Sequence, residues 1–229
     1  MSKRLMLQLD GAPVEFEVRR VMVAGYTGRD TKQVQAHIAE LERQGIPAPP
    51  TVPTVYPLDA SYATTDTAIT IEPRTVSGEA EPALLFLGDA LEDALVSVIV
   101  DFTDRDEERR SIHRSKLFPK PFSSRVWRYR DVAHVWDEIA LRSWVEPQPG
   151  GKLYQSGKLA QLRPPADLLS RLSSELGSEL QGTVLLMGTL PLLAKEFAYA
   201  DYFACEMETP AHSKLAYPCT LVRSGEKGR

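Results

Sequence analysis

Short segments in which apolar and polar residues alternate predict β-strands near both ends of the chain. Residues 5–9 and 14–23 flank Asp10-Gly11, a dipeptide typical of tight turns, and so predict a β-hairpin. Further strands are predicted over residues 67–71, 83–87, 96–100, 183–187, 202–207 and 215–222. We therefore expect a chain in which β-structure dominates.

Three segments have the apolar spacing of amphipathic helices instead. These predicted helices begin after residue 30, cover residues 131–144, and run from residue 164 to residue 177. Asp30 and Gln33 resemble a capping box at the start of the first helix, and Gly45 is a stop signal near its end. The helices are few, so we expect them at the periphery of the β-structure.

Two proline- and glycine-containing stretches separate these elements. Residues 46–57 contain too many prolines for a helix or a central strand and are interpreted as an extended linker. Residues 146–158 contain two prolines and paired glycines and are interpreted as a loop. These breaks predict a small N-terminal unit, residues 1–50, with a hairpin and a helix, followed by a main domain, residues 51–229.

The composition is that of an ordinary globular protein. Hydrophobic residues make up 43% and charged residues 25% of the 229 residues, and the formal net charge is −4. This balance argues against nucleic-acid and anionic-membrane partners. No apolar run reaches the roughly 18 residues of a membrane span, and two cysteines form neither a disulfide framework nor a zinc pattern. We expect a cytoplasmic protein.

Three acidic residues suggest a metal site. Glu79 and Glu81 are two positions apart, so an extended strand points both side chains to one face, and Asp101 ends the apolar run 96–100. Carboxylates that converge in a low-dielectric place need a proton, a basic partner or a cation, and Mg²⁺ or Mn²⁺ suits such oxygens. With 31 acidic residues, however, about four such pairs are expected by chance, and ordinary strand-end acids remain an alternative.

The order of four short motifs resembles the fumarylacetoacetate hydrolase superfamily. They are the Glu79-Ala80-Glu81 pair, the acidic and basic segment 101–106, the Lys-x-Phe segment 116–118, and the strand and Gly-Thr pair of residues 182–189. The resemblance covers roughly residues 55–222. The whole chain is also similar to a bacterial branch of that superfamily, whose members have a segment like residues 24–30. The resemblance implies an α+β, mainly β fold: a mixed β-roll with a few peripheral helices.

The resemblance also implies roles for individual residues. Glu79, Glu81 and Asp101 would bind one Mg²⁺ or Mn²⁺ ion. Lys116 would help to polarise the substrate, and Gly188, Thr189 and Arg105 would bind it. A surface position for Lys116, in a basic cluster with Arg110, Arg114 and Lys120, is the alternative. Superfamily members are often dimers, so we expect a homodimer.

Two departures bear on the chemistry. The superfamily commonly has a histidine near an acidic residue on a mobile lid, where the pair activates water, but residues 58–67, where we expect it, contain no histidine. His113 lies between Asp101 and Lys116 in sequence and is a candidate general base, with an exposed surface histidine as the alternative. The superfamily usually has glutamine where this chain has Glu108, which changes the charge beside the expected metal.

The sequence thus predicts a divalent-metal-dependent hydrolase acting on a 2-oxo acid or a β-dicarbonyl such as an acylpyruvate, through a metal-bound enolate. A decarboxylase, isomerase or tautomerase on the same centre is the first alternative, because it needs no water activation. A second is a non-catalytic binding protein on the same scaffold. A third interprets Glu79 or Glu81 with Asp101 as a glycosidase acid–base pair.

Overall fold

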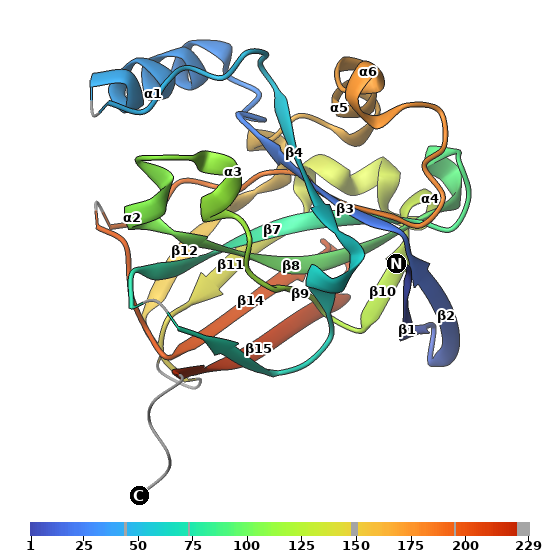
Figure 1. Cartoon of the computed structure of the whole chain (residues 1–229). Coiled ribbons are helices and arrows are strands. Elements are labelled where there is room, and N and C mark those ends of the chain that lie inside the picture. Colours follow the sequence, from blue (N-terminus) through green and yellow to red (C-terminus); the bar gives the residue numbers. More distant parts are fainter. Residues whose placement is uncertain (44, 73, 148–150, 195, 224–229) are drawn as a thin grey trace, which may run out of the picture.

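The computed structural model describes residues 1–43, 45–72, 74–147, 151–194 and 196–223 (Figure 1). Its strands are β1 (Lys3–Leu9), β2 (Ala12–Val18), β3 (Arg20–Gly25), β4 (Thr54–Asp59), β5 (Ala63–Thr64), β6 (Ala68–Ile71), β7 (Val76–Phe86), β8 (Ala94–Asp104), β9 (Lys120–Pro121), β10 (Arg125–Arg128), β11 (Ala140–Trp144), β12 (Leu153–Lys158), β13 (Thr183–Leu186), β14 (Tyr202–Glu208) and β15 (Lys214–Arg223). Its helices are α1 (Thr31–Arg43), α2 (Arg105–Glu108), α3 (Ile112–Ser115), α4 (Tyr129–Val132), α5 (Pro165–Arg171) and α6 (Ser173–Leu176), with 3-10 turns η1 (Ala60–Tyr62), η2 (Leu91–Asp93), η3 (Ala133–Glu138) and η4 (Leu159–Gln161).

Two mixed sheets make up most of the fold. The larger has eight strands in the order β2-β1-β10-β8-β7-β13-β3-β4, and the smaller has five in the order β12-β11-β14-β15-β6. Strands β5 and β9 form a separate parallel pair. The helices lie around the outside of these sheets (Figure 1). The predicted α+β, mainly β architecture is therefore confirmed.

The long hairpin of β7 and β8 lies at the centre of the fold and is buried on both faces. Alternate side chains such as Leu84 and Val98 join the core that also contains Phe203 and Met207 of the smaller sheet. The intervening side chains face the other way, where Leu85, Leu95 and Ile99 pack with residues of β1, β3 and β13. This alternation follows from the two-residue period of a strand. The second face carries the candidate site.

The N-terminal hairpin is confirmed over β1 and β2, as is the helix that follows it, whereas residues 20–23 of the predicted second strand belong to β3, which pairs with β4 and β13. β1 and β2 pair antiparallel from Lys3 with Val18 to Leu9 with Ala12. Asp30 caps α1 by accepting hydrogen bonds from the backbone N–H groups of Lys32 and Gln33. Strands β1, β2 and β3 belong to the larger sheet. The division of the chain at residue 50 stays a prediction.

Three element predictions were wrong in part. The segment 131–144 is helical only as far as Glu138, because residues 140–144 form β11, which pairs with both β12 and β14. The predicted loop 146–158 contains strand β12 from Leu153 onward; residues 148–150 lie outside the described residues. The predicted linker 46–57 contains the start of β4, which tolerates Pro57 because it is the edge strand of the larger sheet.

The helix predicted to start at Pro164-Pro165 is confirmed as α5 and α6, which end at Gly177. The predicted strands over residues 67–71, 183–187, 202–207 and 215–222 are confirmed as β6, β13, β14 and β15. None of the described helices is long and apolar enough to cross a membrane.

Candidate active site

The three acids singled out by the sequence lie on one face of the central hairpin. Glu79 of β7 is directly opposite Asp101 of β8, and Glu81 follows two positions along β7, so all three side chains share a face. Asp101 is completely buried and Glu81 is only 3% exposed, whereas Glu79 is partly exposed. The extended strand therefore brings the three carboxyl groups together, as the spacing predicts.

Lys116 lies among these acids. It follows helix α3, whose first turn is capped by the Ser111 hydroxyl. Its Nζ donates hydrogen bonds to Asp101 Oδ2 and, over 2.9 Å, to Thr103 Oγ1, and lies 4.0 Å from Glu79 Oε2. Burial alone would lower the pKa of Lys116, but Asp101 and Glu79 raise it above its usual value. Lys116 is therefore a buried, protonated donor in the site.

A second lysine reaches the same carboxylate, and sequence reasoning missed it. Lys120 is completely buried on β9; its Nζ lies 3.0 Å from Asp101 Oδ1 and donates to the Phe102 carbonyl over 2.8 Å. Burial lowers the pKa of Lys120 to about 8. Burial raises the pKa of Asp101, but Lys116 and Lys120 outweigh it and lower that pKa to about 2. Asp101 is therefore ionised and has an ammonium group at each oxygen.

Arg105, at the start of α2, holds the outer part of the cluster. Its Nε donates to Ser77 Oγ over 2.7 Å, Nη1 binds Glu108 at 3.0 Å, and Nη2 lies 3.1 Å from Glu79. Its guanidinium also lies 3.9 Å from the centre of the Phe197 ring. Arg105 is buried, and its predicted contact with substrate stays a prediction. Its described partners give it a role in orienting Glu79 and Glu108.

Glu81 is held by a backbone group. Its Oε2 accepts a hydrogen bond of 2.8 Å from the backbone N–H of Gly188. Burial, together with repulsion from Asp101 and Glu79, raises the pKa of Glu81 well above its usual value. Gly188 has φ +90°, and a Cβ at that position would lie 1.9 Å from Thr27 Oγ1. Only glycine fits there, so the Gly188 N–H can approach Glu81.

Thr189 is held by a buried glutamine that the sequence had not indicated. Gln155 of β12 is completely buried, and its amide Nε2 donates to Thr189 Oγ1 at 2.6 Å and to the Leu190 carbonyl at 2.8 Å. Its Oε1 accepts from the Ala80 N–H at 2.9 Å and from Ser143 Oγ at 2.8 Å. The Thr189 hydroxyl donates to the Ala80 carbonyl at 2.9 Å. Gln155 therefore fixes both Thr189 and the backbone between Glu79 and Glu81.

Two histidines lie on helices near the cluster. His113 on α3 is exposed, and its Nε2 is 2.9 Å from the Pro57 carbonyl oxygen. His37 on α1 is exposed as well, with its ring centre 6.4 Å from that of Tyr26, and Glu40 follows it by three positions. Burial and the nearby Glu108 raise the pKa of the Tyr26 phenol. Tyr26, which has a positive φ of 59°, thus connects α1 with the acidic cluster.

The donor set suits a hard divalent cation. Carboxylate oxygens are the ligands that Mg²⁺ and Mn²⁺ prefer, and the buried Asp101 Oδ1 has no hydrogen bond despite its proximity to Lys120. Within the described residues, however, no three His, Cys, Asp or Glu side chains are arranged as a metal site. Lys116 Nζ lies between Asp101 and Glu79. The carboxylates therefore fit a divalent cation by their chemistry, although lysine ammonium groups of the chain lie against the same oxygens.

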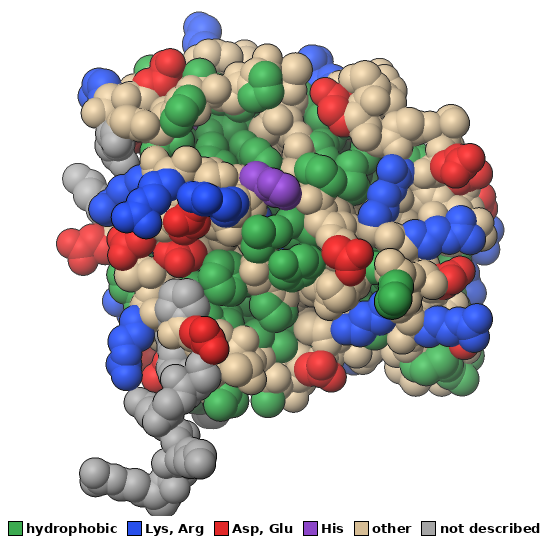
Figure 2. Space-filling model, viewed as in Figure 1, with side chains coloured by type: hydrophobic (Ala, Val, Ile, Leu, Met, Phe, Trp, Pro, Cys, Tyr) green, Lys and Arg blue, Asp and Glu red, His purple; other side chains and the backbone are tan. Residues whose placement is uncertain are grey.

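The surface around α2 and α3 combines apolar and basic groups. Figure 2 shows hydrophobic side chains at the centre of this face and basic side chains grouped over α2. Among the described residues, Leu117 after α3 and Phe197 beside Arg105 are exposed hydrophobic side chains. The surface beside the cluster is thus partly apolar.

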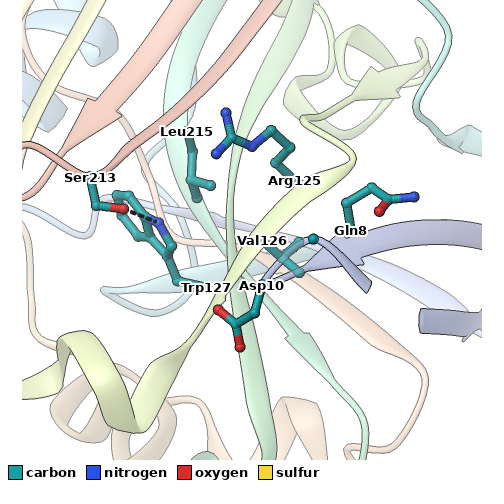
Figure 3. Close-up of a pocket in the computed structure, with 8 residues that line it drawn as sticks. Gln8, Asp10, Arg125, Val126, Trp127, Ser213 and Leu215 are labelled. Carbon is teal, nitrogen blue, oxygen red and sulfur yellow. Dashed lines mark hydrogen bonds between the residues drawn. The ribbon is translucent and has the colours of Figure 1, made fainter. Parts of the chain in front are cut away.

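A depression of about 480 Å³ lies elsewhere, at the other end of β8 (Figure 3). Its lining includes Asp10, Arg125 and Trp127. Asp10 and Arg125 extend in opposite directions in Figure 3, and Asp10 is paired with Arg128 outside the lining. The Trp127 indole N–H donates to Ser213 Oγ over 3.0 Å. No convergent set of reactive groups is found there, so the acidic cluster is the better candidate.

Comparisons with known proteins identify the family and the fold. A family model described as "Protein of unknown function (DUF2848)" matches residues 24–217. No curated protein matches. The fold is similar to that of an Oleispira antarctica protein assigned as a fumarylacetoacetate isomerase/hydrolase, with 21% identity, a TM-score of 0.68, and coverage of 94% of this chain and 99% of that one.

Two further solved structures have a similar fold. One is a fumarylpyruvate hydrolase from Pseudomonas aeruginosa in complex with Mn²⁺ and pyruvate, with 19% identity, a TM-score of 0.64, and coverage of 96% of this chain and 97% of that one. The other is a 5-carboxymethyl-2-hydroxymuconate delta-isomerase from Mycobacterium smegmatis, with 19% identity, a TM-score of 0.63, and coverage of 91% and 80%. The fumarylacetoacetate hydrolase fold is therefore confirmed.

Proposed function

Because the chain belongs to the DUF2848 family and has the fumarylacetoacetate hydrolase fold, we propose that it is a divalent-metal-dependent hydrolase. Its substrate would be a 2-oxo acid or a β-dicarbonyl, such as an acylpyruvate. The observation that carries the proposal is the shared face of Glu79, Glu81 and Asp101, with the protonated Lys116 among them. A similarly folded fumarylpyruvate hydrolase was solved with Mn²⁺ and pyruvate, which supports this substrate class.

Glu79, Glu81 and Asp101 would hold Mg²⁺ or Mn²⁺, which supplies Lewis-acid polarisation of the substrate's adjacent oxygens. The proposed reaction is the cleavage of a carbon–carbon bond. Water adds to the acyl carbonyl carbon, the bond to the neighbouring CH₂ breaks, and its electron pair leaves with pyruvate as an enolate that takes up a proton at carbon. The products are a carboxylic acid and pyruvate.

Lys116 is proposed to stabilise the developing enolate oxygen. Its Nζ stays protonated beside Asp101 and Glu79, so it donates a hydrogen bond without first having to gain a proton. Arg105 orients Glu79 and Glu108, and the Gly188-Thr189 backbone would bind the substrate carboxylate. Charge and burial support the roles of Lys116 and of Arg105 toward its acidic partners, whereas substrate contact by Arg105, Gly188 and Thr189 is part of the proposal.

The general base is proposed to be a histidine, and two positions compete for the role. For His113, a hydrogen bond from Nε2–H to the Pro57 carbonyl would leave Nδ1 free to accept a proton from water. For His37, the contact with Tyr26 links its helix to the cluster, and Glu40 lies one turn further along. In that case His37 and Glu40 of α1 would take the place of the superfamily's lid histidine and acid, since residues 58–67 contain no histidine.

The decisive experiment loads the EDTA-treated protein with Mn²⁺ and follows loss of the enol absorbance of acylpyruvates. We expect turnover that depends on Mn²⁺ and falls by at least about 100-fold in Lys116→Met, the size of a lost transition-state donor. Comparing His113→Ala with His37→Ala assigns the base, because only one variant should lose turnover while keeping Mn²⁺ binding. Absence of turnover on any acylpyruvate, with Mn²⁺ bound, contradicts the hydrolase.

A decarboxylase or isomerase on the same centre is the second candidate. Both histidines are exposed, and these reactions need no histidine to activate water. The similarity of the fold to that of a delta-isomerase also favours this candidate. CO₂ release, or exchange of substrate protons with ²H₂O without cleavage, distinguishes these activities from hydrolysis. A non-catalytic binding protein would show neither of them.

A further inference from the structure

Asp101 is the only one of the three acids on the shared face with two lysine partners among the described residues. Lys116 Nζ binds Oδ2, and Lys120 Nζ lies 3.0 Å from Oδ1. The two lysines differ in access: Lys116 is slightly exposed at the site, whereas Lys120 is completely enclosed. Lys120 therefore acts on the site through Asp101 and not by touching substrate.

The backbone fixes Lys120 in this position. β9 pairs with β5 through Lys120 and Ala63, and Phe122, two residues later, bridges to Ile99 of β8. The Lys120 ammonium also donates to the Phe102 carbonyl, next to Asp101. A flexible surface lysine would turn away when a cation approaches, but an enclosed one remains beside Asp101.

Counting charges shows what this second ammonium does. Glu79, Glu81, Asp101 and Glu108 oppose Arg105, Lys116 and Lys120. Burial favours the neutral form of Glu81, but a metal ligand has to be ionised, and in that state the seven groups have a net charge of −1. A divalent cation changes this to +1, and a bound carboxylate then brings it to zero. Uncompensated charge is costly in a buried site, so the two ligands favour each other.

We propose that Lys120 makes divalent-metal binding at this site dependent on an anionic ligand. The proposal rests on the metal centre of the proposed function and assigns Lys120 as a positioning residue. Without Lys120 the cluster has a net charge of −2, which a divalent cation alone neutralises. The metal then binds well by itself, and a carboxylate adds less.

The test measures Mn²⁺ binding by the electron paramagnetic resonance signal of free Mn²⁺, with and without pyruvate. In the unchanged protein, pyruvate should tighten Mn²⁺ binding by about tenfold or more, within the usual range of coupling between two ligands. In Lys120→Met, Mn²⁺ alone should bind about tenfold more tightly, and the effect of pyruvate should shrink to about threefold or less. Lys120→Gln retains a donor for the Phe102 carbonyl and serves as a second neutral variant.

Lys214→Met is the matched control, because it removes a lysine paired with Glu206 and Glu208 on the outer sheet. It should bind Mn²⁺ like the unchanged protein. Equal or weaker Mn²⁺ binding in both Lys120 variants overturns the proposal while leaving the metal centre intact. Failure of all proteins to bind Mn²⁺, with or without pyruvate, refutes the metal centre and the role of Lys120 together.

Discussion

Replacing Gln155 with leucine tests whether the acidic strand is held in place by its buried amide. Gln155 makes four hydrogen bonds with groups on three other strands or loops, and leucine, of similar size, can make none. The hydroxyls of Ser143 and Thr189 can rotate to other partners, and Thr189 keeps its bond to the Ala80 carbonyl. The Ala80 N–H and the Leu190 carbonyl lose their amide partner in a buried environment.

Each unsatisfied buried group costs roughly 1–3 kcal/mol, so the free energy of unfolding should fall by about 2–6 kcal/mol. Urea unfolding in EDTA measures this loss, and an unchanged dependence on urea shows that the same surface is exposed on unfolding. Gln35→Leu, on the exposed side of α1, should change stability by less than about 0.5 kcal/mol. A loss below about 1 kcal/mol in Gln155→Leu would refute the reasoning.

Further predictions concern Glu81, Gly188 and the assembly. Because the pKa of Glu81 is raised in the folded protein, the native state favours the neutral carboxyl. The contribution of this group to the free energy of unfolding is therefore fully present below pH 4.5 and is lost as pH rises through the folded pKa. In EDTA, the unfolding temperature of Glu81→Gln should therefore rise relative to that of the unchanged protein between pH 5 and pH 8. A constant difference between the two unfolding temperatures would contradict the raised pKa of Glu81. Gly188→Ala should lower the unfolding temperature by more than Gly177→Ala, because both positions have positive φ but only the first Cβ would clash with Thr27. Light scattering should give the mass of a homodimer, and a monomer at assay concentrations would contradict the expectation drawn from the resemblance.

The sequence predicted the acidic face because a strand has a strict two-residue period. Glu79 and Glu81 had to point the same way, and the similarity to a known superfamily grouped Asp101 with them, which the structure places opposite Glu79. The helix predicted over residues 131–144 failed in its second half, because the apolar spacing of Ile139 and Trp144 suits either structure until partner strands are known. Strand β11 forms because β12 and β14 are available on both sides.

Lys120 and Gln155 could not be identified from local pattern. Lys120 follows Arg110 and Arg114 in a basic stretch, which is typical of a solvent-exposed segment. It is buried because β9 pairs with β5 and places the lysine side chain beside Asp101. Gln155 lies beside a glycine- and proline-containing stretch, and its role depends on four groups that come from distant parts of the chain. Both residues owe their function to tertiary contacts alone.

Thermal unfolding with Mn²⁺ and pyruvate, compared with EDTA, tests the central claim that Glu79, Glu81 and Asp101 form a divalent-metal centre. A metal present at about 100 times its dissociation constant should add roughly 2.7 kcal/mol to the free energy of unfolding. The account predicts this upward shift for the unchanged protein and for Glu206→Ala, from the other acidic pair, and its loss in Glu81→Ala. An equal shift in Glu81→Ala, or no shift in any protein, would contradict the account.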